Sequence, residues 1–267
     1  MKQKYFNLNA TVVNIYSHPD FKSAVVTQGL LGESCEIIDS KDCWFNVNQW
    51  DGYSGWIHKH QGIVADKTYD ANLTVFEMDG IVTKKSGKTV IRGIIFGNLL
   101  IGKPMNGGFN VTLPDGEKGW TNTLLGRMTE QPTRKSIIRL ARSFMGVPYL
   151  WGGKSPHGFD CSGYIQTIYK TFNIELPRDA YQQADYLKEY TITMEQAKQA
   201  DLHFFKNDGK ITHVALAEEN GYFLHAQGWV KEESFDSSAP NFNHDLKNKY
   251  ACSVSMEPIL GNEELSI

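Results

Sequence analysis

The sequence predicts an α+β protein in which two small all-β units precede a domain that combines helices with an antiparallel sheet. Three observations support this prediction. A block of short strand-like runs recurs at a fixed offset in the first half of the chain. Helical periodicity begins near residue 134, and three strand-like runs follow after residue 200.

Composition and charge indicate an ordinary globular protein of two or three domains. The chain has 267 residues, 41% of them hydrophobic and 21% charged, with a net charge of −3. It contains no block of like charges, so we expect no nucleic-acid partner. No apolar run is long enough to span a bilayer or to act as a secretory signal. We therefore expect a cytoplasmic protein without membrane association, or a periplasmic or secreted one if a signal has been removed.

The four cysteines are Cys35, Cys43, Cys161 and Cys252. They are few for a secreted scaffold and show no CxxC spacing, so we expect reduced thiols and no zinc site. Cys35 and Cys43 flank a short polar turn, and their pairing in an oxidising compartment stays open at this stage.

The repeat is visible when residues 45–56, FNVNQWDGYSGW, are compared with residues 109–120, FNVTLPDGEKGW. The same offset of 64 residues aligns VTQGLL at 26–31 with VIRGII at 90–95. In both copies a short strand leads to an Asp-Gly turn, where Gly accepts a positive φ without strain. These features indicate a duplicated unit that forms a small barrel.

The two copies resemble bacterial SH3-like domains over most of residues 5–127. With the change to helical periodicity that follows, this resemblance predicts three domains. They are an SH3-like domain at 1–63, a second at 64–128, and a larger domain at 129–267.

The larger domain opens with a predicted helix from Ser136, in which Ile137, Ala141 and Phe144 share one face with Leu140. Gly146 and Pro148 should end this helix. Later elements follow from similar patterns: a helix after Asp160, a polar helix near 179–200, and strands at 202–205, 212–217 and 222–228. Helices followed by strands predict an α+β domain with an antiparallel sheet.

Cys161 lies in GFDCSGYIQ at 158–166 and is predicted to fall in the first turn of a helix, because Asp160 is a preferred N-cap residue. The partial positive charge there favours a thiolate, and unpaired N–H groups can stabilise an oxyanion. Gly163 removes bulk beside the sulfur. A buried structural cysteine explains this segment equally well, so the histidines have to decide.

His213 lies in ITHVALA and His225 in YFLHAQG, with an Asn-Gly hairpin signal between them. Their even separation predicts two imidazoles on one face of the hairpin, directly opposite or diagonal. If the helix that begins at Cys161 packs on that face, a thiol, a base and an orienting group line up. A metal site built from the same three residues is the alternative, and it lacks an acidic residue at ligand spacing.

The segments PYLWGG, FDCSGYIQ, LPRDAYQQA, DLHFF, THVALA and FLHAQG, in this order and spacing, resemble the NlpC-type cysteine peptidases of bacterial cell-wall metabolism. The resemblance covers about residues 134–257. It implies a papain-like fold with Cys161 as nucleophile, His213 as base and His225 as the residue that orients the base. Tyr149 matches a family tyrosine whose hydroxyl donates to the oxyanion, although a core aromatic explains it equally well. No metal or cofactor is implied.

The family cleaves the amide between γ-D-glutamate and a diamino acid, usually meso-diaminopimelate. Two SH3-like units before the catalytic domain resemble a subgroup that trims free murein peptides with an N-terminal L-Ala. This resemblance implies that Asp160, Ser162 and Asp179 contact the substrate amine. It also implies that Glu33 and Tyr53 of the first SH3-like unit close the pocket. Asp179 is equally well explained as a helix N-cap.

The sequence therefore predicts a γ-D-glutamyl–L-diamino acid endopeptidase that recycles murein tri- or tetrapeptides such as L-Ala-γ-D-Glu-meso-diaminopimelate. Cys161 would attack the γ-carbonyl to form a thioester, and His213 would protonate the leaving amine. Two alternatives are an exported hydrolase whose SH3-like units bind polymeric peptidoglycan, and a non-catalytic wall-binding protein. The diamino acid, the peptide length and the oligomeric state stay open at this stage.

Overall fold

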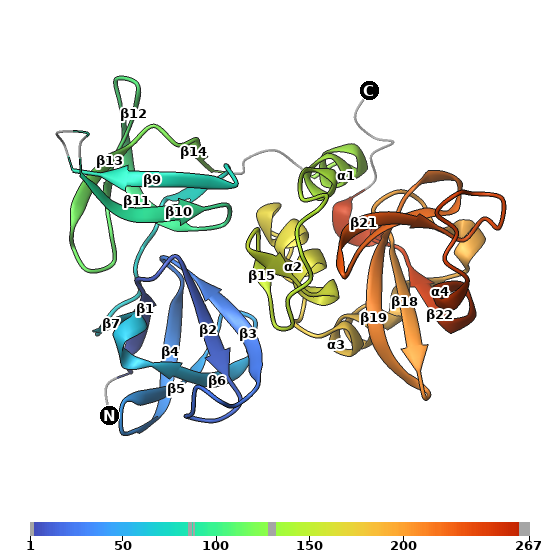
Figure 1. Cartoon of the computed structure of the whole chain (residues 1–267), viewed down its shortest axis with the longest axis horizontal. Coiled ribbons are helices and arrows are strands. Elements are labelled where there is room, and N and C mark those ends of the chain that lie inside the picture. Colours follow the sequence, from blue (N-terminus) through green and yellow to red (C-terminus); the bar gives the residue numbers. More distant parts are fainter. Residues whose placement is uncertain (1–2, 85–86, 88, 128–131, 262–267) are drawn as a thin grey trace. The chain divides into compact units, whose positions relative to one another are not determined.

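The structure is a computed structural model that describes residues 3–84, 87, 89–127 and 132–261 (Figure 1). The chain forms two compact units, Met1–Arg127 and Met128–Ile267. The predicted boundary between residues 128 and 129 lies outside the described residues. Helices and strands occur together in the second unit, whereas the regular elements described in the first unit are strands and one short 3₁₀ helix, which confirms the α+β class.

The first unit contains two seven-stranded sheets. The first sheet is built from β1 (Tyr5–Leu8), β2 (Val12–Tyr16), β3 (Val25–Leu30), β4 (Ser34–Lys41), β5 (Trp44–Asn48), β6 (Ser54–His58) and β7 (Gly62–Ala65), with the 3₁₀ helix η1 (Lys59–Gln61) before β7. The second is built from β8 (Leu73–Val75), β9 (Asp79–Thr83), β10 (Val90–Ile95), β11 (Leu99–Met105), β12 (Gly108–Thr112), β13 (Lys118–Thr121) and β14 (Leu125–Gly126).

The two sheets have the same topology. Their strand orders are β3-β2-β6-β5-β4-β1-β7 and β10-β9-β13-β12-β11-β8-β14. Adding seven to each strand number of the first order gives the second. The two segments of the sequence repeat thus occupy equivalent strands, and the predicted duplication is a duplication of the fold.

The Asp-Gly turns of the two copies also match in detail. Gly52 has a φ of +76° and Gly116 a φ of +85°, the left-handed conformation that glycine adopts without strain. The carboxylates of Asp51 and Asp115 each accept a hydrogen bond from the backbone N–H two residues further on, at 3.0 and 2.9 Å. The local chemistry of the repeated Asp-Gly pair therefore sets both turns, as predicted.

Each sheet encloses its own apolar cluster, and the first copy contributes Leu31 to the cluster of the second. This residue follows β3 of the first sheet but is fully buried in the cluster of the second, with Val75 and Leu100. Cys35 is buried in the first cluster. Neither Cys35 nor the half-buried Cys43 is part of a disulfide, so the two cysteines do not pair.

The second unit contains α2, a helix that is buried along most of its length, and a six-stranded antiparallel sheet. The strand order of this sheet is β17-β22-β18-β19-β20-β21. The helices of this unit are α1 (Arg134–Ser143), α2 (Cys161–Thr171), α3 (Ala180–Tyr186), α4 (His244–Lys249) and α5 (Glu257–Leu260), with 3₁₀ helices η2 (Lys188–Tyr190), η3 (Met194–Gln196) and η4 (Glu219–Gly221). Its strands are β15 (Lys154–Ser155), β16 (Gly158–Phe159), β17 (Thr191–Ile192), β18 (Leu202–Asn207), β19 (Lys210–Ala217), β20 (Tyr222–Gln227), β21 (Trp229–Ser234) and β22 (Tyr250–Val254).

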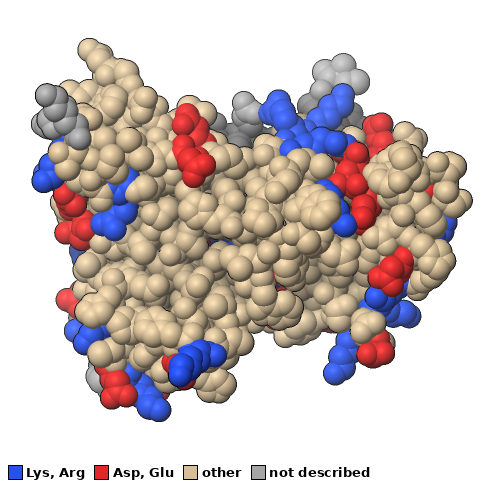
Figure 2. All heavy atoms as spheres, in the orientation of Figure 1, with Lys and Arg blue, Asp and Glu red and all other residues tan. Residues whose placement is uncertain are grey.

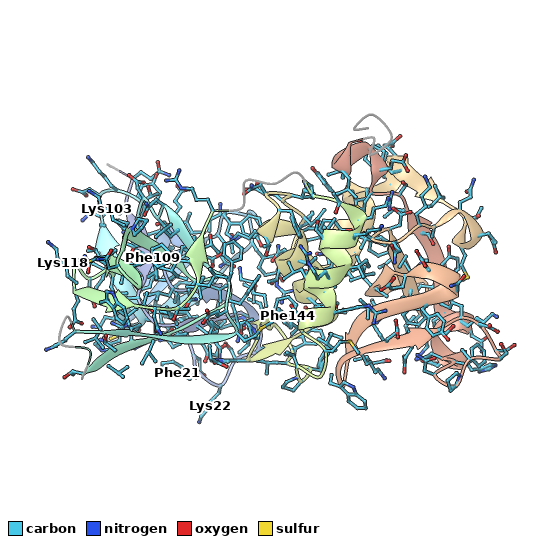
Figure 3. The ribbon with its side chains drawn as sticks, turned by 90° about the horizontal axis from the view of Figure 1, so that it is seen from above. Phe21, Lys22, Lys103, Phe109, Lys118 and Phe144 are labelled. Atoms are coloured by element: carbon cyan, nitrogen blue, oxygen red, sulfur yellow. The ribbon has the colours of Figure 1, made fainter. Side chains whose placement is uncertain are left out.

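Helix α1 begins two residues before the predicted start because Thr133 caps it. The Thr133 hydroxyl accepts from the Ser136 N–H at 3.1 Å, and the Ser136 hydroxyl accepts from the Thr133 N–H at 3.0 Å. Ile137 is fully buried. Phe144, which follows the helix and is labelled in Figure 3, is fully buried, and its ring centroid lies 5.0 Å from that of Phe159.

The predicted helix near 179–200 is wrong beyond Tyr186. Helix α3 has seven residues and is followed by the short 3₁₀ helices η2 and η3, with strand β17 between them. Thr191 and Ile192 are β-branched and pair with Val254 and Ser253 of β22. A β-branched pair at a sheet edge gains more from extended pairing than from continuing a polar helix.

The surface has mixed charge on the face shown in Figure 2, where Lys and Arg side chains lie among Asp and Glu side chains. Within the described residues, none of the helices has both the length and the apolar character needed to cross a membrane.

Candidate active site

Cys161 is the first residue of α2, and Asp160 is the N-cap residue, as predicted. The Asp160 carboxylate accepts from the Gly163 N–H at 2.7 Å. A Cβ atom on Gly163 would lie only 2.1 Å from the carbonyl oxygen of Gly153, so this helix start requires glycine. The glycine therefore allows α2 to begin directly against the backbone of Gly153, the last residue of PYLWGG.

The sulfur of Cys161 lies against the backbone of β19. It contacts the residues on either side of His213, Thr212 and Val214. The Thr212 carbonyl oxygen is 4.0 Å from Sγ, and the Val214 N–H donates to the sulfur. In the described chain, β19 pairs with β20 only at Leu216 and Ala217. The backbone groups of Thr212 and Val214, which would pair with β20 if the ladder continued, are therefore available to the sulfur.

The two predicted histidines are in direct contact. His213 Nε2 lies 2.9 Å from His225 Nδ1, and the rings meet nearly edge to face at 84°. Because Leu216 pairs with Leu224, His225 lies diagonal to His213 across the hairpin. The diagonal arrangement, one of the two predicted, is the one observed.

Glu233 completes this chain of contacts, and the sequence analysis did not identify it. His225 Nε2 lies 2.9 Å from Glu233 Oε2. The carboxylate also accepts from Lys231 Nζ at 2.8 Å and from the Asn243 side chain. A signal was present in the sequence. Residues 225 and 233 are an even number apart across the turn at Gly228, so alternation puts both side chains on one face of the β20–β21 hairpin.

Burial and hydrogen bonding set the charges of this chain. Burial lowers the pKa of His213 to about 3, and the neighbouring His225 adds to the effect. Burial also lowers the pKa of His225, although Glu233 opposes it. Burial raises the pKa of Glu233, but hydrogen bonds from His225, Lys231 and Asn243 outweigh it and lower that pKa to about 2. At neutral pH both imidazoles are neutral and the carboxylate is charged.

These charges fix the proton positions. A charged carboxylate only accepts, so His225 Nε2 carries a proton and donates to Glu233. The Nδ1 atom of a neutral His225 is then an acceptor, so His213 Nε2 carries a proton and donates to it. His213 Nδ1 is consequently unprotonated and able to act as a base.

The surroundings of the Cys161 sulfur favour the thiol, whereas the sequence predicted a thiolate. Burial raises the pKa of the Cys161 thiol to about 12, and the Asp160 carboxylate adds to the rise. Backbone N–H groups of Val214 and Ser162 offset only part of it. The helix start was expected to stabilise the anion, but its N-cap carries a negative charge of its own.

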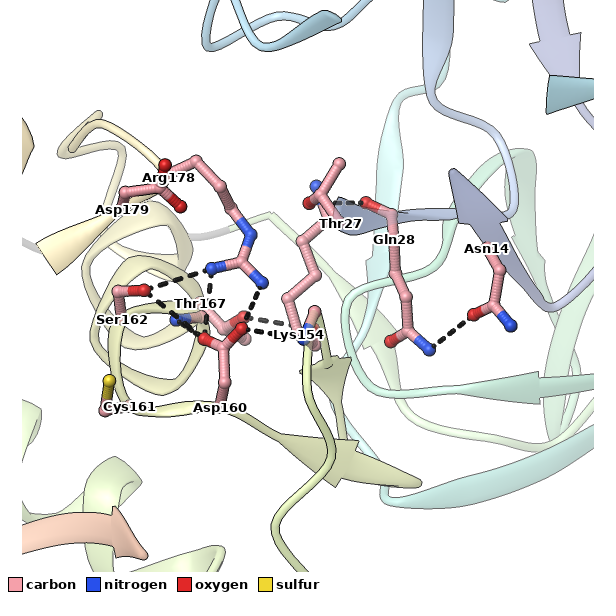
Figure 4. Close-up of polar contacts among 12 residues, drawn as sticks. Asn14, Thr27, Gln28, Lys154, Asp160, Cys161, Ser162, Thr167, Arg178 and Asp179 are labelled. Carbon is pink, nitrogen blue, oxygen red and sulfur yellow. Dashed lines mark hydrogen bonds and ion pairs between the residues drawn. The ribbon is translucent and has the colours of Figure 1, made fainter. Parts of the chain in front are cut away.

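Asp160 and Ser162 belong to a buried network centred on Arg178 (Figure 4). Arg178 is 1% exposed, and its Nη1 and Nη2 atoms bond the two Asp160 oxygens at 3.0 and 2.6 Å. The same Nη1 bonds Ser162 Oγ at 3.1 Å. The Asp160 carboxylate also accepts from Gly152 and Gly163. This carboxylate anchors the loop to α2, and contact of Asp160 and Ser162 with the substrate amine stays a prediction.

Asp179 and Tyr149 remain candidates. Asp179 is the half-buried N-cap residue of α3, as predicted, and its N–H donates to Gln182 Oε1 at 3.0 Å. Tyr149 is half-buried and held by a bond from its N–H to the Gly228 carbonyl at 2.8 Å. Burial, together with the neighbouring Cys161 and Asp160, raises the pKa of its phenol, which keeps the hydroxyl protonated. Within the described chain the Cys161 N–H has no hydrogen-bond acceptor, so it offers a second oxyanion donor.

Glu33 and Tyr53 lie in turns of the first unit. Glu33 is buried between β3 and β4, where its Oε2 accepts from the Leu30 N–H at 2.8 Å. Tyr53 is half-buried in the turn between β5 and β6. Their role in closing a substrate pocket stays a prediction.

The histidine contacts also bear on the alternative of a metal site. Both His225 nitrogens are engaged, one with His213 and one with Glu233. Among the described residues, no group of three or more His, Cys, Asp or Glu side chains is arranged to hold a metal ion.

A thiol at a helix start, beside a strand whose imidazole is fixed by a second imidazole and a carboxylate, defines a cysteine hydrolase site. The NlpC/P60 family pattern matches residues 146–246, and the bacterial SH3 domain pattern matches residues 11–61. The chain belongs to the NlpC/P60 family and is a cysteine peptidase.

Two curated relatives have the same name, γ-D-glutamyl-L-lysine dipeptidyl-peptidase. The chain is 30% identical to the Bacillus cereus protein over 226 residues, which cover 75% of this chain and 66% of that protein. It is 30% identical to the Bacillus subtilis protein over 220 residues, which cover 76% of this chain and 73% of that protein. A crystal structure of an NlpC/P60 family protein from Bacillus cereus has the same fold, with a TM-score of 0.81 at 22% identity over 94% of this chain and 99% of that one.

Proposed function

We propose that the protein hydrolyses the amide between γ-D-glutamate and a diamino acid in free murein peptides, and releases L-Ala-γ-D-Glu from the amino end. The observation that carries this proposal is the chain of contacts from His213 through His225 to Glu233, with Cys161 Sγ against the backbone carbonyl of Thr212, the residue before His213. The relatives' shared name supports it, since a dipeptidyl-peptidase removes two residues from a free N-terminus. That name specifies L-lysine, whereas the sequence resemblance pointed to meso-diaminopimelate.

The reaction begins with the Cys161 thiol and ends with its regeneration. Sγ attacks the γ-carbonyl carbon as its proton passes to His213 Nδ1. The oxyanion accepts from the Cys161 N–H and the Tyr149 hydroxyl. The imidazolium then gives its proton to the leaving amine, and a thioester remains on Cys161. Water attacks the thioester with His213 as base, and L-Ala-γ-D-Glu departs while the thiol is restored.

The His225–Glu233 pair stabilises the step in which His213 is charged. An imidazolium at His213 donates through Nε2 to His225, whose own proton is held by the Glu233 carboxylate. A negative charge two hydrogen bonds away lowers the energy of the ion pair formed during attack. This compensates for a thiol and an imidazole whose pKa values both favour the neutral state.

The free amine of the substrate is assigned to Asp179 in this proposal. A carboxylate that is partly open to solvent, as that of Asp179 is, suits an ammonium group. Glu33 and Tyr53 would complete the amine pocket, and a cytoplasmic role in recycling would follow from a preference for small free peptides.

The test compares L-Ala-γ-D-Glu-L-Lys with its N-acetylated form and with intact sacculi, by chromatography of the products. We expect L-Ala-γ-D-Glu from the free peptide alone, and no product with Cys161→Ala. Equal cleavage of free and acetylated peptide would remove the amine site from the proposal. Efficient release from sacculi would favour the exported hydrolase of polymeric peptidoglycan instead.

A further inference from the structure

A pocket of about 370 Å³ opens beside His213, and the proposed reaction does not yet use it. Tyr149, Thr212 and His213 line it together with three residues of α4, Asp245, Leu246 and Lys249. Asp160, Arg178 and Asp179 are not among the residues that line this pocket. The amine end of the substrate is assigned to Asp179, so the group that leaves from the γ-carbonyl must occupy a different region, and this pocket adjoins the base that protonates it.

The pocket combines an apolar interior with a charged rim. Phe205 and Leu246 are 1% and 2% exposed and supply apolar walls. Asp245 and Lys249, one turn apart on α4, form an ion pair of 2.8 Å, with side chains 63% and 40% exposed. Asp245 Oδ2 makes this contact, and within the described chain Oδ1 has no partner. Such a pocket suits a chain of methylene groups that ends in charge.

We propose that this pocket binds the side chain of the diamino acid, and that Asp245 and Lys249 recognise its far end. The inference rests on the proposed function and adds the chemistry of the leaving group. The distal ammonium, present in both L-lysine and meso-diaminopimelate, pairs with Asp245. The distal carboxylate, present only in meso-diaminopimelate, pairs with Lys249.

The two charges on α4 predict a preference between the two diamino acids. A distal ammonium with a carboxylate beside it can align against the ion pair so that each charge meets an opposite one. The ammonium of a lysine side chain has no carboxylate beside it. It can pair with Asp245, but it then also approaches the positive Lys249 Nζ, which is only 2.8 Å from Asp245. Exposed ion pairs are modest, so each contact should change kcat/KM by roughly two- to fivefold. The meso-diaminopimelate peptide should therefore be the better substrate.

The experiment measures kcat/KM for three peptides, L-Ala-γ-D-Glu followed by meso-diaminopimelate, L-lysine or the uncharged L-norleucine. Asp245→Asn should lower kcat/KM for both charged peptides, and Asp245→Glu should restore it. Lys249→Met should lower it for the meso-diaminopimelate peptide and leave or raise it for the lysine peptide. The norleucine peptide reports the intact fold and should be unchanged in every variant.

A matched control is the exposed ion pair of Asp185 and Lys188, 3.1 Å apart and outside the pocket. Asp185→Asn and Lys188→Met should alter no kcat/KM value. If the α4 variants change all three peptides equally, or none, the pocket does not recognise the distal charges and the inference is rejected. If the wild-type protein leaves all three peptides intact, the proposed function fails and the inference fails with it.

Discussion

Glu233 Oε2 lies 2.9 Å from His225 Nε2, and this contact decides which nitrogen of His213 serves as the base. The carboxylate requires a proton on His225 Nε2, which leaves Nδ1 to accept from His213 Nε2. The remaining atom, His213 Nδ1, is left unprotonated. The Glu233 carboxylate thus determines the proton positions of both imidazoles. The imidazole further from it, that of His213, acts as the base.

Replacing Glu233 should impair catalysis without weakening substrate binding. In Glu233→Gln the side chain can still accept from His225, but the charge that stabilises the imidazolium is lost. We expect kcat to fall by about 10- to 100-fold with KM little changed, measured by steady-state kinetics. The neighbouring Glu232→Gln, which loses a contact to Arg142 instead, is the matched control. An unaltered kcat in Glu233→Gln would remove this residue from the catalytic chain.

The protonated thiol predicts slow alkylation of Cys161 at neutral pH. Its pKa is raised to about 12, so the reactive thiolate should become more abundant with each pH unit up to alkaline pH. Peptide mass spectrometry after iodoacetamide treatment, at pH values from 5 to 10, measures the rate for this cysteine separately from the other three. A rate that is already constant above pH 6 would instead show a thiolate–imidazolium pair in the resting protein.

Arg178 should be important for stability. It is buried against Asp160, and Arg178→Met would leave that carboxylate buried without its cation. Breaking one side of a buried pair costs about 3–5 kcal/mol of the free energy of unfolding. Urea denaturation measures the loss, with the exposed Arg139→Met as control. The double variant Asp160→Asn, Arg178→Met should lose less than Arg178→Met alone. A wild-type midpoint for Arg178→Met would contradict this account of the network.

His203 should make stability fall in mild acid. Burial lowers its pKa to about 4, below the unfolded value of 6.5, so between these values only the unfolded chain binds the proton. The stabilisation is complete above pH 6.5 and is lost as the pH falls towards 4, by about 2 kcal/mol between pH 7.5 and 5. Denaturation at both pH values, in wild type and in His203→Phe, measures it. The same pH dependence in both proteins would show that other groups cause it.

The features predicted correctly from the sequence are those that local patterns determine. Asp160 before Cys161 marks a helix start through its capping preference, and the even spacing of His213 and His225 places both rings on one face whatever the details of the turn. The duplication of the SH3-like unit could also be predicted from the sequence, because the Asp-Gly turns and the strands around them repeat at one offset.

The features that were missed depend on tertiary structure. Arg178 meets Asp160 only because α3 begins beside α2, and a buried arginine carries no local signal. Ile192 is extended because β22 lies next to it, which shortened the expected helix. The charge state of Cys161 reflects burial and a neighbouring carboxylate, and neither can be weighed before the packing is known.

The most direct test is the mass of the protein quenched during turnover of L-Ala-γ-D-Glu-L-Lys. The account predicts a covalent L-Ala-γ-D-Glu adduct on the peptide that contains Cys161, and neither adduct nor product with Cys161→Ala. Release of L-Ala-γ-D-Glu by Cys161→Ala at the wild-type rate would contradict the account.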